Sequence, residues 1–248
     1  VGDWDRAQEV LDRALLLASE IDDQDAKVPM VLDSMGQLKM LRGEFTEAQG
    51  LLQRAVSLAM ENGNKWYARQ ALCTLGRCHL AMNDPNSALD YGEEALALAE
   101  TIGDRQAVCE SSLLLAEAYL RSDRVDRCIE LVKRASAEAT DSSADVGMIG
   151  EAERLHGFIA MAQDDATLAA QHFGRSLSIF EMLGDRYRSA IASEALGAAY
   201  AAATPGRAAE RLAGAVQAFR DLGAGPDIAR AEQALDSLDR EAPERRSD

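Results

Sequence analysis

The chain has 248 residues, of which 47% are hydrophobic, and this supplies enough apolar surface for a large folded core. Its formal net charge of −16 repels phosphate backbones and argues against nucleic-acid binding by this region. No apolar run reaches the roughly 18 residues that a membrane span needs, and no signal peptide is visible, so the sequence predicts a cytoplasmic protein without a membrane partner.

Helix-forming residues dominate the composition. The chain has five prolines and long runs rich in Ala, Leu, Glu and Arg, and no alternating segment of strand length stands out. Cys73, Cys78, Cys109 and Cys128 lack the C-x-x-C spacing of metal and redox sites, so free thiols in a reducing cytosol are expected. The chain begins with Val1 rather than Met, which leaves open whether it is a whole protein or a fragment.

The first predicted element is a helix over residues 3–21, which opens with the phrase Gly-Asp-Trp-Asp-Arg-Ala. A similar phrase, Gly-Glu-Phe-Thr-Glu-Ala, returns 41 positions later at residues 43–48. Two series of small residues keep this spacing of 39 to 41 positions along the chain, and such a period predicts an internal repeat. The series are Ala7, Ala48, Ala88, Cys128, Ala169 and Ala208, and Gly36, Gly76, Ala116, Gly157 and Gly197.

Each repeat is predicted to hold two helices, because apolar residues between the small residues follow helical spacing. A Gly-Asp or Gly-Asn phrase between repeats ends one helix in the left-handed conformation and caps the next. A last amphipathic helix is predicted over residues 226–239. The predicted pairs are 26–42 with 44–61, 65–82 with 85–101, 104–121 with 123–139, 145–162 with 165–182, and 186–202 with 205–221.

The small residues are expected where the two helices of a pair cross, because Gly or Ala lets their backbones approach closely. Trp4 and Phe45 are expected to wedge over the neighbouring pair. One pair cannot bury its apolar face alone, so the pairs should stack. The predicted array covers residues 1–239, as a half repeat 1–25, repeats 26–64, 65–103, 104–144, 145–184 and 185–225, and a capping helix 226–239, followed by a disordered tail 240–248.

Two stretches carry a recognisable pattern: Gly43-Glu44-Phe45 with Ala48 and the preceding Gly36, and Leu196-Gly197-x-x-Tyr200 with the later Ala208, Leu212 and Ala215. They resemble the tetratricopeptide repeat (TPR), over residues 1 to about 223. The period of about 40 residues is similar to the variant found in bacterial signalling and transcription regulators. The resemblance implies an all-α, right-handed superhelical solenoid whose first helices line a concave groove where a partner lies.

No constellation of residues predicts catalysis, a metal site or a cofactor. His79, His156 and His172 lie far apart in the sequence and outside the zinc motifs, and no phosphate-binding loop is present. The register predicts that His156 is a core histidine. The same repeat carries Glu153 and His156 where the repeat over residues 65–103 carries Leu72 and Leu75, so the pattern defines its packing least well.

A stripe along the first helices is the candidate partner-binding surface. Its aromatic members are natural anchors for a peptide or a helix, with packing in the core as the alternative for each. Acidic residues outnumber arginines in the stripe, which favours a basic or neutral ligand. The candidate groove residues are Trp66, Gln70, Arg77, Glu110, Glu117, Arg154, Phe158, Tyr187 and Glu194.

These features favour a non-catalytic module that binds a peptide or protein segment, as a scaffold or sensor in a bacterial regulatory protein. One alternative is a regulatory domain that binds a small-molecule or signalling-peptide effector. Another is self-assembly, because the first helix lacks a partner helix for its flank of Val10, Leu11 and Leu15. It would give a homodimer through the N-terminal half repeat.

Overall fold

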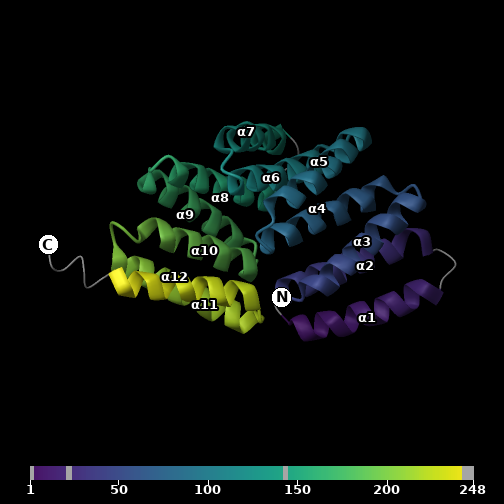
Figure 1. Ribbon diagram of the computed structural model, residues 1–248, viewed down its shortest axis with the longest axis horizontal. Helices are drawn as coiled ribbons and strands as arrows, with labels where there is room; N and C mark the ends of the chain where they lie inside the picture. The colour runs from purple at the N-terminus through teal and green to yellow at the C-terminus, as the bar shows by residue number, and fades with distance from the viewer. Residues whose placement is uncertain (1–2, 21–23, 142–144, 242–248) are drawn as a thin grey trace. The chain divides into compact units, whose positions relative to one another are not determined.

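The computed structural model describes residues 3–20, 24–141 and 145–241, and every regular element in these ranges is an α-helix (Figure 1). The helices form two compact units, one built from α1 to α7 and the other from α8 to α12. None of the helices in the described ranges is long and apolar enough to cross a membrane.

The first unit contains three antiparallel helix pairs preceded by a single helix. The second helix of each pair packs against the first helix of the next pair, and the first helices α2, α4 and α6 also contact one another in sequence. The bounds are α1 Trp4–Glu20, α2 Gln24–Arg42, α3 Phe45–Glu61, α4 Lys65–Ala81, α5 Pro85–Ile102, α6 Arg105–Arg121 and α7 Val125–Asp141.

The second unit has two pairs followed by α12, which packs against α11. Its helices are α8 Val146–Ala162, α9 Ala166–Met182, α10 Arg186–Tyr200, α11 Pro205–Leu222 and α12 Gly225–Glu241. Each observed boundary lies within two residues of the boundary predicted from the sequence, and the all-α fold of stacked helix pairs is confirmed. The helix α12 includes the first two residues of the predicted tail, and residues 242–248 lie outside the described residues.

The core of each unit runs through successive pairs. Leu52 of α3 packs with Leu75 and Cys78 of α4, and Phe45 lies against the same cluster, as predicted for the turn aromatic. In the second unit, Phe173 of α9 packs with residues of α8 and α10. Each cluster therefore joins one pair to the first helix of the next, which is how a pair that cannot bury its own apolar face is stabilised.

The small residues of the two series are buried apart from the half-buried Ala7, but the reason for glycine differs from the predicted one. A Cβ on Gly157 would collide with the ring of Phe173, and a Cβ on Gly36 would lie 2.6 Å from Leu52. The nearest backbone atom to the Cβ position of Gly36 is farther away, at 3.3 Å. Gly36 and Gly157 thus make room for a large side chain of the second helix, and the close approach of backbones is a secondary effect.

The turns between pairs confirm the predicted capping pattern. Gly103 has φ +74°, and the carboxylate of Asp104 accepts hydrogen bonds from the first amides of α6. The turns inside the pairs also contain left-handed residues, Asn83, Asp123 and Asp164, with φ near +60°. These three follow the same repeat period, and Asn and Asp are the residues after Gly that best tolerate this conformation.

Candidate functional site

Charged and aromatic side chains gather where α2, α4 and α6 lie side by side. We call this surface the α2–α4–α6 face and define it by six residues that extend the predicted groove stripe. Four of them were predicted as groove residues, and the other two lie on α2. They are Met30, Asp33, Trp66, Gln70, Arg77 and Glu110.

An ion-pair network under this face links α4 to α6. Arg69 donates to Glu110 Oε2 at 2.6 Å, and Arg77 donates to Glu110 Oε1 at 2.9 Å. Arg69 also donates to Gln70 Oε1 at 2.7 Å. Only 2% of Arg69 is exposed, so Glu110 neutralises a charge that lies almost entirely inside the protein.

The pKa values of the two acids, Glu110 and Asp33, are shifted in opposite directions. Burial alone would raise the pKa of Glu110, but the charges and hydrogen bonds of Arg77 and Arg69 outweigh burial and hold the pKa at about 2. Asp33 is 9% exposed, and its burial raises its pKa above the ordinary value, with Thr74 and Arg77 offsetting the shift only in part. Glu110 is therefore firmly ionised, while Asp33 is the more easily protonated of the two.

Apolar side chains flank the network on the side of the helix N-termini. Trp66 is 45% exposed and Met30 is 44% exposed. The guanidinium of Arg69 lies 5.7 Å from the Trp66 ring centroid, and Tyr67 stands edge-on to the same ring with its hydroxyl 3.8 Å from the sulfur of Met30. A tryptophan that is held from two sides and still half exposed can pack against an incoming side chain without losing much side-chain entropy.

Three further predicted groove residues pair locally. Glu117 accepts a hydrogen bond from Arg121 of its own helix. In the second unit, Arg154 donates to Glu151 at 2.8 Å and lies over Phe158, whose ring meets Phe173 edge-on. Phe158 packs against the core of its unit, which is the alternative considered for the aromatic residues.

Tyr187 and Glu194 contact α12. Tyr187 donates to Asp227 at 3.0 Å, and Arg230 donates to both carboxylate oxygens of Glu194 at 2.8 and 2.6 Å. Arg230 also donates to Asp227. The last helix therefore packs on the stripe of α10. Tyr187 and Glu194 contribute to this packing.

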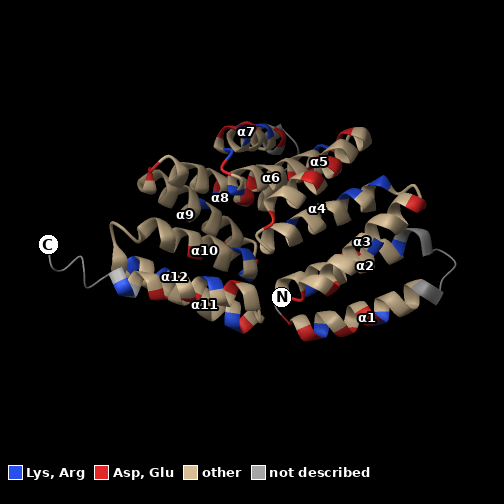
Figure 2. Cartoon of the chain, in the orientation of Figure 1, with Lys and Arg blue, Asp and Glu red and all other residues tan. Residues whose placement is uncertain are grey.

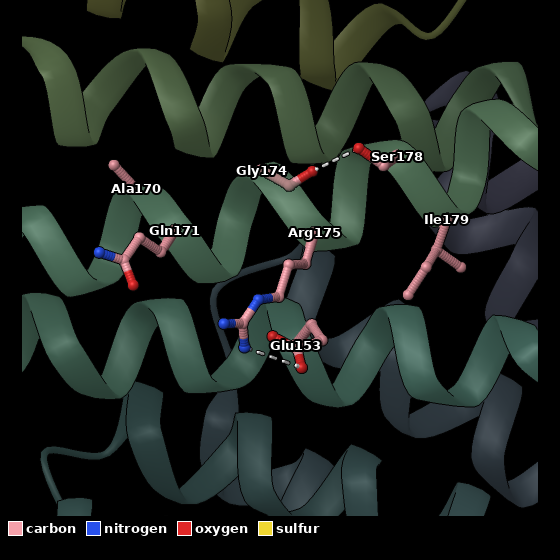
Figure 3. A pocket seen from close by; sticks show the side chains of 7 residues that line it. All are labelled: Glu153, Ala170, Gln171, Gly174, Arg175, Ser178 and Ile179. Carbon is pink, nitrogen blue, oxygen red and sulfur yellow. Dashed lines mark hydrogen bonds and ion pairs between the residues drawn. The ribbon is translucent and has the colours of Figure 1, made fainter.

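A shallow hollow of about 690 Å³ lies over α9 in the second unit (Figure 3). Arg175 reaches toward Glu153 across it, with 3.8 Å between Nη1 and Oε1, and the Ser178 hydroxyl donates to the Gly174 carbonyl. The charged groups of the hollow are thus turned toward one another. Its lining consists of Glu153, Ala170, Gln171, Gly174, Arg175, Ser178 and Ile179.

In the repeat over residues 145–162, the polar residues at the positions of Leu72 and Leu75 are half-buried. Glu153 accepts a hydrogen bond from Nδ1 of His172 at 2.7 Å, and His156 stacks on His172 with ring centroids 5.3 Å apart. His156 is half-buried, so it is less enclosed than the register predicts. No group of three His, Cys, Asp or Glu side chains in the described ranges has the geometry of a metal site.

Arg69 is the important residue of the face that the sequence did not single out. It lies about two helical turns before Gly76 on the same stripe, but a charged residue beside an exposed tryptophan resembles a solvated position. The available signal is that α6 carries Glu110 at 41 positions from Arg69, which is one repeat further and therefore on the adjacent first helix.

Comparison with known proteins places these repeats in a family. Residues 27–101 match the family model described as tetratricopeptide repeat. The human SH3 domain and tetratricopeptide repeat-containing protein 2 is 26% identical over 149 residues, 59% of this chain and 11% of that protein. A protein named as a putative HTH-type transcriptional regulator in Mycobacterium tuberculosis is 32% identical over 134 residues, 54% of this chain and 15% of the relative. The chain therefore spans less than a fifth of either relative.

Solved structures extend the likeness of fold to nearly the whole chain. A Rap protein in complex with Competence and Sporulation Factor matches with a TM-score of 0.73 and 12% identity, over 93% of this chain and 67% of that one. NprR in complex with its cognate peptide NprX matches with a TM-score of 0.68 and 13% identity, over 99% of this chain and 70% of the other. Residues 27–101 thus match the tetratricopeptide repeat family, and the chain shares the helix-pair fold of these solved structures.

Proposed function

We propose that the α2–α4–α6 face binds a short peptide segment, and that the chain is the non-catalytic, ligand-sensing part of a bacterial regulatory protein. The observation that carries the proposal is the half-exposed Trp66, whose ring lies against the guanidinium of the buried Arg69, the residue that pairs with Glu110. An aromatic anchor next to fixed polar groups is the usual composition of an energetic centre in a peptide interface.

The comparisons support this proposal at the level of fold. Rap and NprR share the fold and were solved with a factor or a peptide bound, and the mycobacterial relative is named as a transcriptional regulator. A peptide that binds such a face would shift the helix pairs toward the arrangement that fits it best, because a ligand stabilises the state for which it has the higher affinity.

The test is selection of binders from a phage-displayed library of random 12-residue peptides on the full chain. Affinities of the selected peptides are then measured by fluorescence anisotropy. Trp66→Ala should weaken binding at least tenfold, because the anchor is lost. Trp4→Ala on α1 is the matched control and should change affinity less than twofold. Failure to select any peptide, or equal affinities for wild type and Trp66→Ala, would reject the proposal.

Self-association is a second candidate, and the surface of α1 favours it. Val10 is 60% exposed, and Leu16 and Leu17 are also exposed, whereas Leu15 packs into the core between α1 and its neighbours. Exposed apolar side chains on one helix can form the contact between two copies. Light scattering of the full chain distinguishes a dimer from a monomer, and Leu17→Lys should dissociate such a dimer.

A further inference from the structure

Two buried polar atoms of the network under the α2–α4–α6 face have no hydrogen-bond partner among the described residues. They are the Oδ1 acceptor of Asp33 and the Nε donor of Arg69. Both residues are more than nine-tenths buried, and a buried polar group without a hydrogen-bond partner destabilises the fold. Both atoms are covered in the free protein, so a ligand group that displaces the covering side chains and supplies a donor to Asp33 and an acceptor to Arg69 would recover this loss on binding.

The surrounding charges restrict what that group can be. The electrostatic neighbours of the Asp33 carboxyl are Arg77 and Arg69, which are cationic, and Glu110, which is anionic. A ligand ammonium or guanidinium placed beside Asp33 would face two arginines. A ligand carboxylate placed beside Arg69 would face Glu110 and Asp33. A neutral group that both donates and accepts avoids both repulsions, and among side chains the carboxamide of Asn or Gln does this with separate atoms.

The protein already uses a carboxamide in this network. Gln70 presents its Oε1 to Nη2 of Arg69 at 2.7 Å. This contact shows that a carboxamide oxygen fits against the guanidinium of Arg69 without disturbing its bond to Glu110. A second carboxamide, delivered by a ligand, would use the same chemistry on the remaining Nε.

The spacing along the helices sets the distance between the ligand's two contacts. Met30 precedes Asp33 by three residues, and Trp66 precedes Arg69 by three residues, so the apolar and polar parts of the face are separated by about 4.5 Å along the helix axes at about 1.5 Å per residue. In an extended peptide, residues i and i+2 point to the same side and lie about 6.6 Å apart. Because adjacent residues of an extended peptide point to opposite sides, an alternate pair is the shortest same-side spacing that reaches both parts.

We propose that the α2–α4–α6 face selects peptides in which an apolar side chain packs on Trp66 and Met30, and an Asn or Gln two positions away supplies the missing donor to Asp33 and the missing acceptor to Arg69. This inference rests on the proposed peptide-binding function and adds its chemical specificity. Neutral polar ligands are thus preferred over the basic ones that the composition of the stripe also favours.

The test is a cycle of substitutions in the protein and in one peptide selected on the wild-type full chain. The peptide is compared with its Asn→Asp (or Gln→Glu) derivative on wild type, Asp33→Asn and Asp90→Asn. The last is a matched control, because Asp90 is an exposed acid on α5. Circular dichroism verifies that each variant keeps its helix content.

The amide-to-acid change should weaken binding at least tenfold on wild type and on Asp90→Asn. It should weaken binding less than threefold on Asp33→Asn, because an amide at position 33 can donate to the new carboxylate. The same loss on all three proteins, or selected peptides without an enriched Asn or Gln two positions from the apolar residue, would overturn the inference while leaving Trp66-dependent binding intact. Failure to select any peptide would overturn the proposed function and this inference together.

Discussion

Arg69 shows how one buried residue can set the properties of those around it. Its guanidinium lies under Trp66 and holds one oxygen of Glu110, while the more exposed Arg77 holds the other. Glu110 is consequently ionised even in moderately acidic solution, with a pKa of about 2. Removal of one member of a buried ion pair costs more than the pair contributes, because the remaining charge is left without a partner.

Glu110→Gln should therefore lower the free energy of unfolding by about 3–5 kcal/mol at pH 7. The folded-state pKa of about 2 lies below the ordinary value of 4.5, so the stabilisation by ionised Glu110 is complete above about pH 5 and is lost as the pH falls from 4.5 toward 2. The difference between wild type and variant should thus shrink in acid. Urea titrations followed by circular dichroism at pH 7 and pH 3 measure both values.

Glu94→Gln is the control for this substitution, because Glu94 is exposed on α5 of the same unit. It should change stability by less than about 0.5 kcal/mol at either pH. Equal stability of wild type and Glu110→Gln at pH 7 would show that the network contributes nothing.

At the scale of single residues, the sequence predicts where on a helix a residue lies better than it predicts which residue it contacts. Trp66, Arg77 and Glu110 were expected on one stripe from the helical period, and Arg77 and Glu110 form an ion pair. The partner of Tyr187 was not identified in this way, because Asp227 lies on a helix that was expected only to cap the array. Contacts between helices depend on rotations of a few degrees that a periodic pattern does not contain.

Among the secondary-structure elements, the pairing of α8 with α9 depends on one missing side chain. The ring of Phe173 is fully buried and occupies the space where a side chain on Gly157 would begin. Gly174, one residue after Phe173, has no atom within 4 Å of its own Cβ position. The two glycines share a helical conformation and differ in their surroundings.

Gly157→Ala should destabilise the second unit by about 1–3 kcal/mol, because the new methyl group overpacks the helix crossing. Gly174→Ala should stabilise it by about 0.5–1 kcal/mol, because alanine loses less backbone entropy in a helix. Both changes add the same group to a helix, so their difference isolates the steric effect. Chemical denaturation of the two variants gives opposite signs if this is correct, and two stabilising substitutions would disprove the steric role of Phe173.

The element boundaries could be predicted from the sequence because their causes are local. The Gly103–Asp104 turn contains both the residue that ends α5 and the residue that caps α6. The left-handed Asn83, Asp123 and Asp164 were less visible, because Asn and Asp also occur at many turns with negative φ. Their shared period is the signal that would have identified them.

Over the whole molecule, the net negative charge is the main long-range electrostatic effect on the stability of the fold. The chain carries 42 acidic and 26 basic residues, and both signs alternate along α1 and α12 (Figure 2). The excess of acid nevertheless repels itself at long range, and this repulsion destabilises the folded state when salt is low. Dissolved salt screens buried ion pairs such as Arg69–Glu110 less than exposed charges. The strength of such a pair therefore changes less with salt concentration.

The melting temperature should therefore rise as NaCl increases from about 10 mM to about 150 mM, over which the Debye length falls from about 30 Å to about 8 Å. Differential scanning calorimetry at pH 7 measures this effect. KCl at the same concentrations should give the same rise, which separates screening from binding of a particular cation. A melting temperature that falls with salt would mean that exposed ion pairs outweigh the net repulsion.

The left-handed turns have a consequence for how such a chain can grow. Residues 64–103 begin with the cap Asn64, end with the left-handed Gly103, and are followed by another cap, Asp104. A tandem duplication of this segment would create one new junction, from Gly103 to a copy of Asn64, and this junction would have the chemistry of the existing turns. One genetic event could thus lengthen the surface offered to a ligand by a whole helix pair, with no compensating substitution elsewhere.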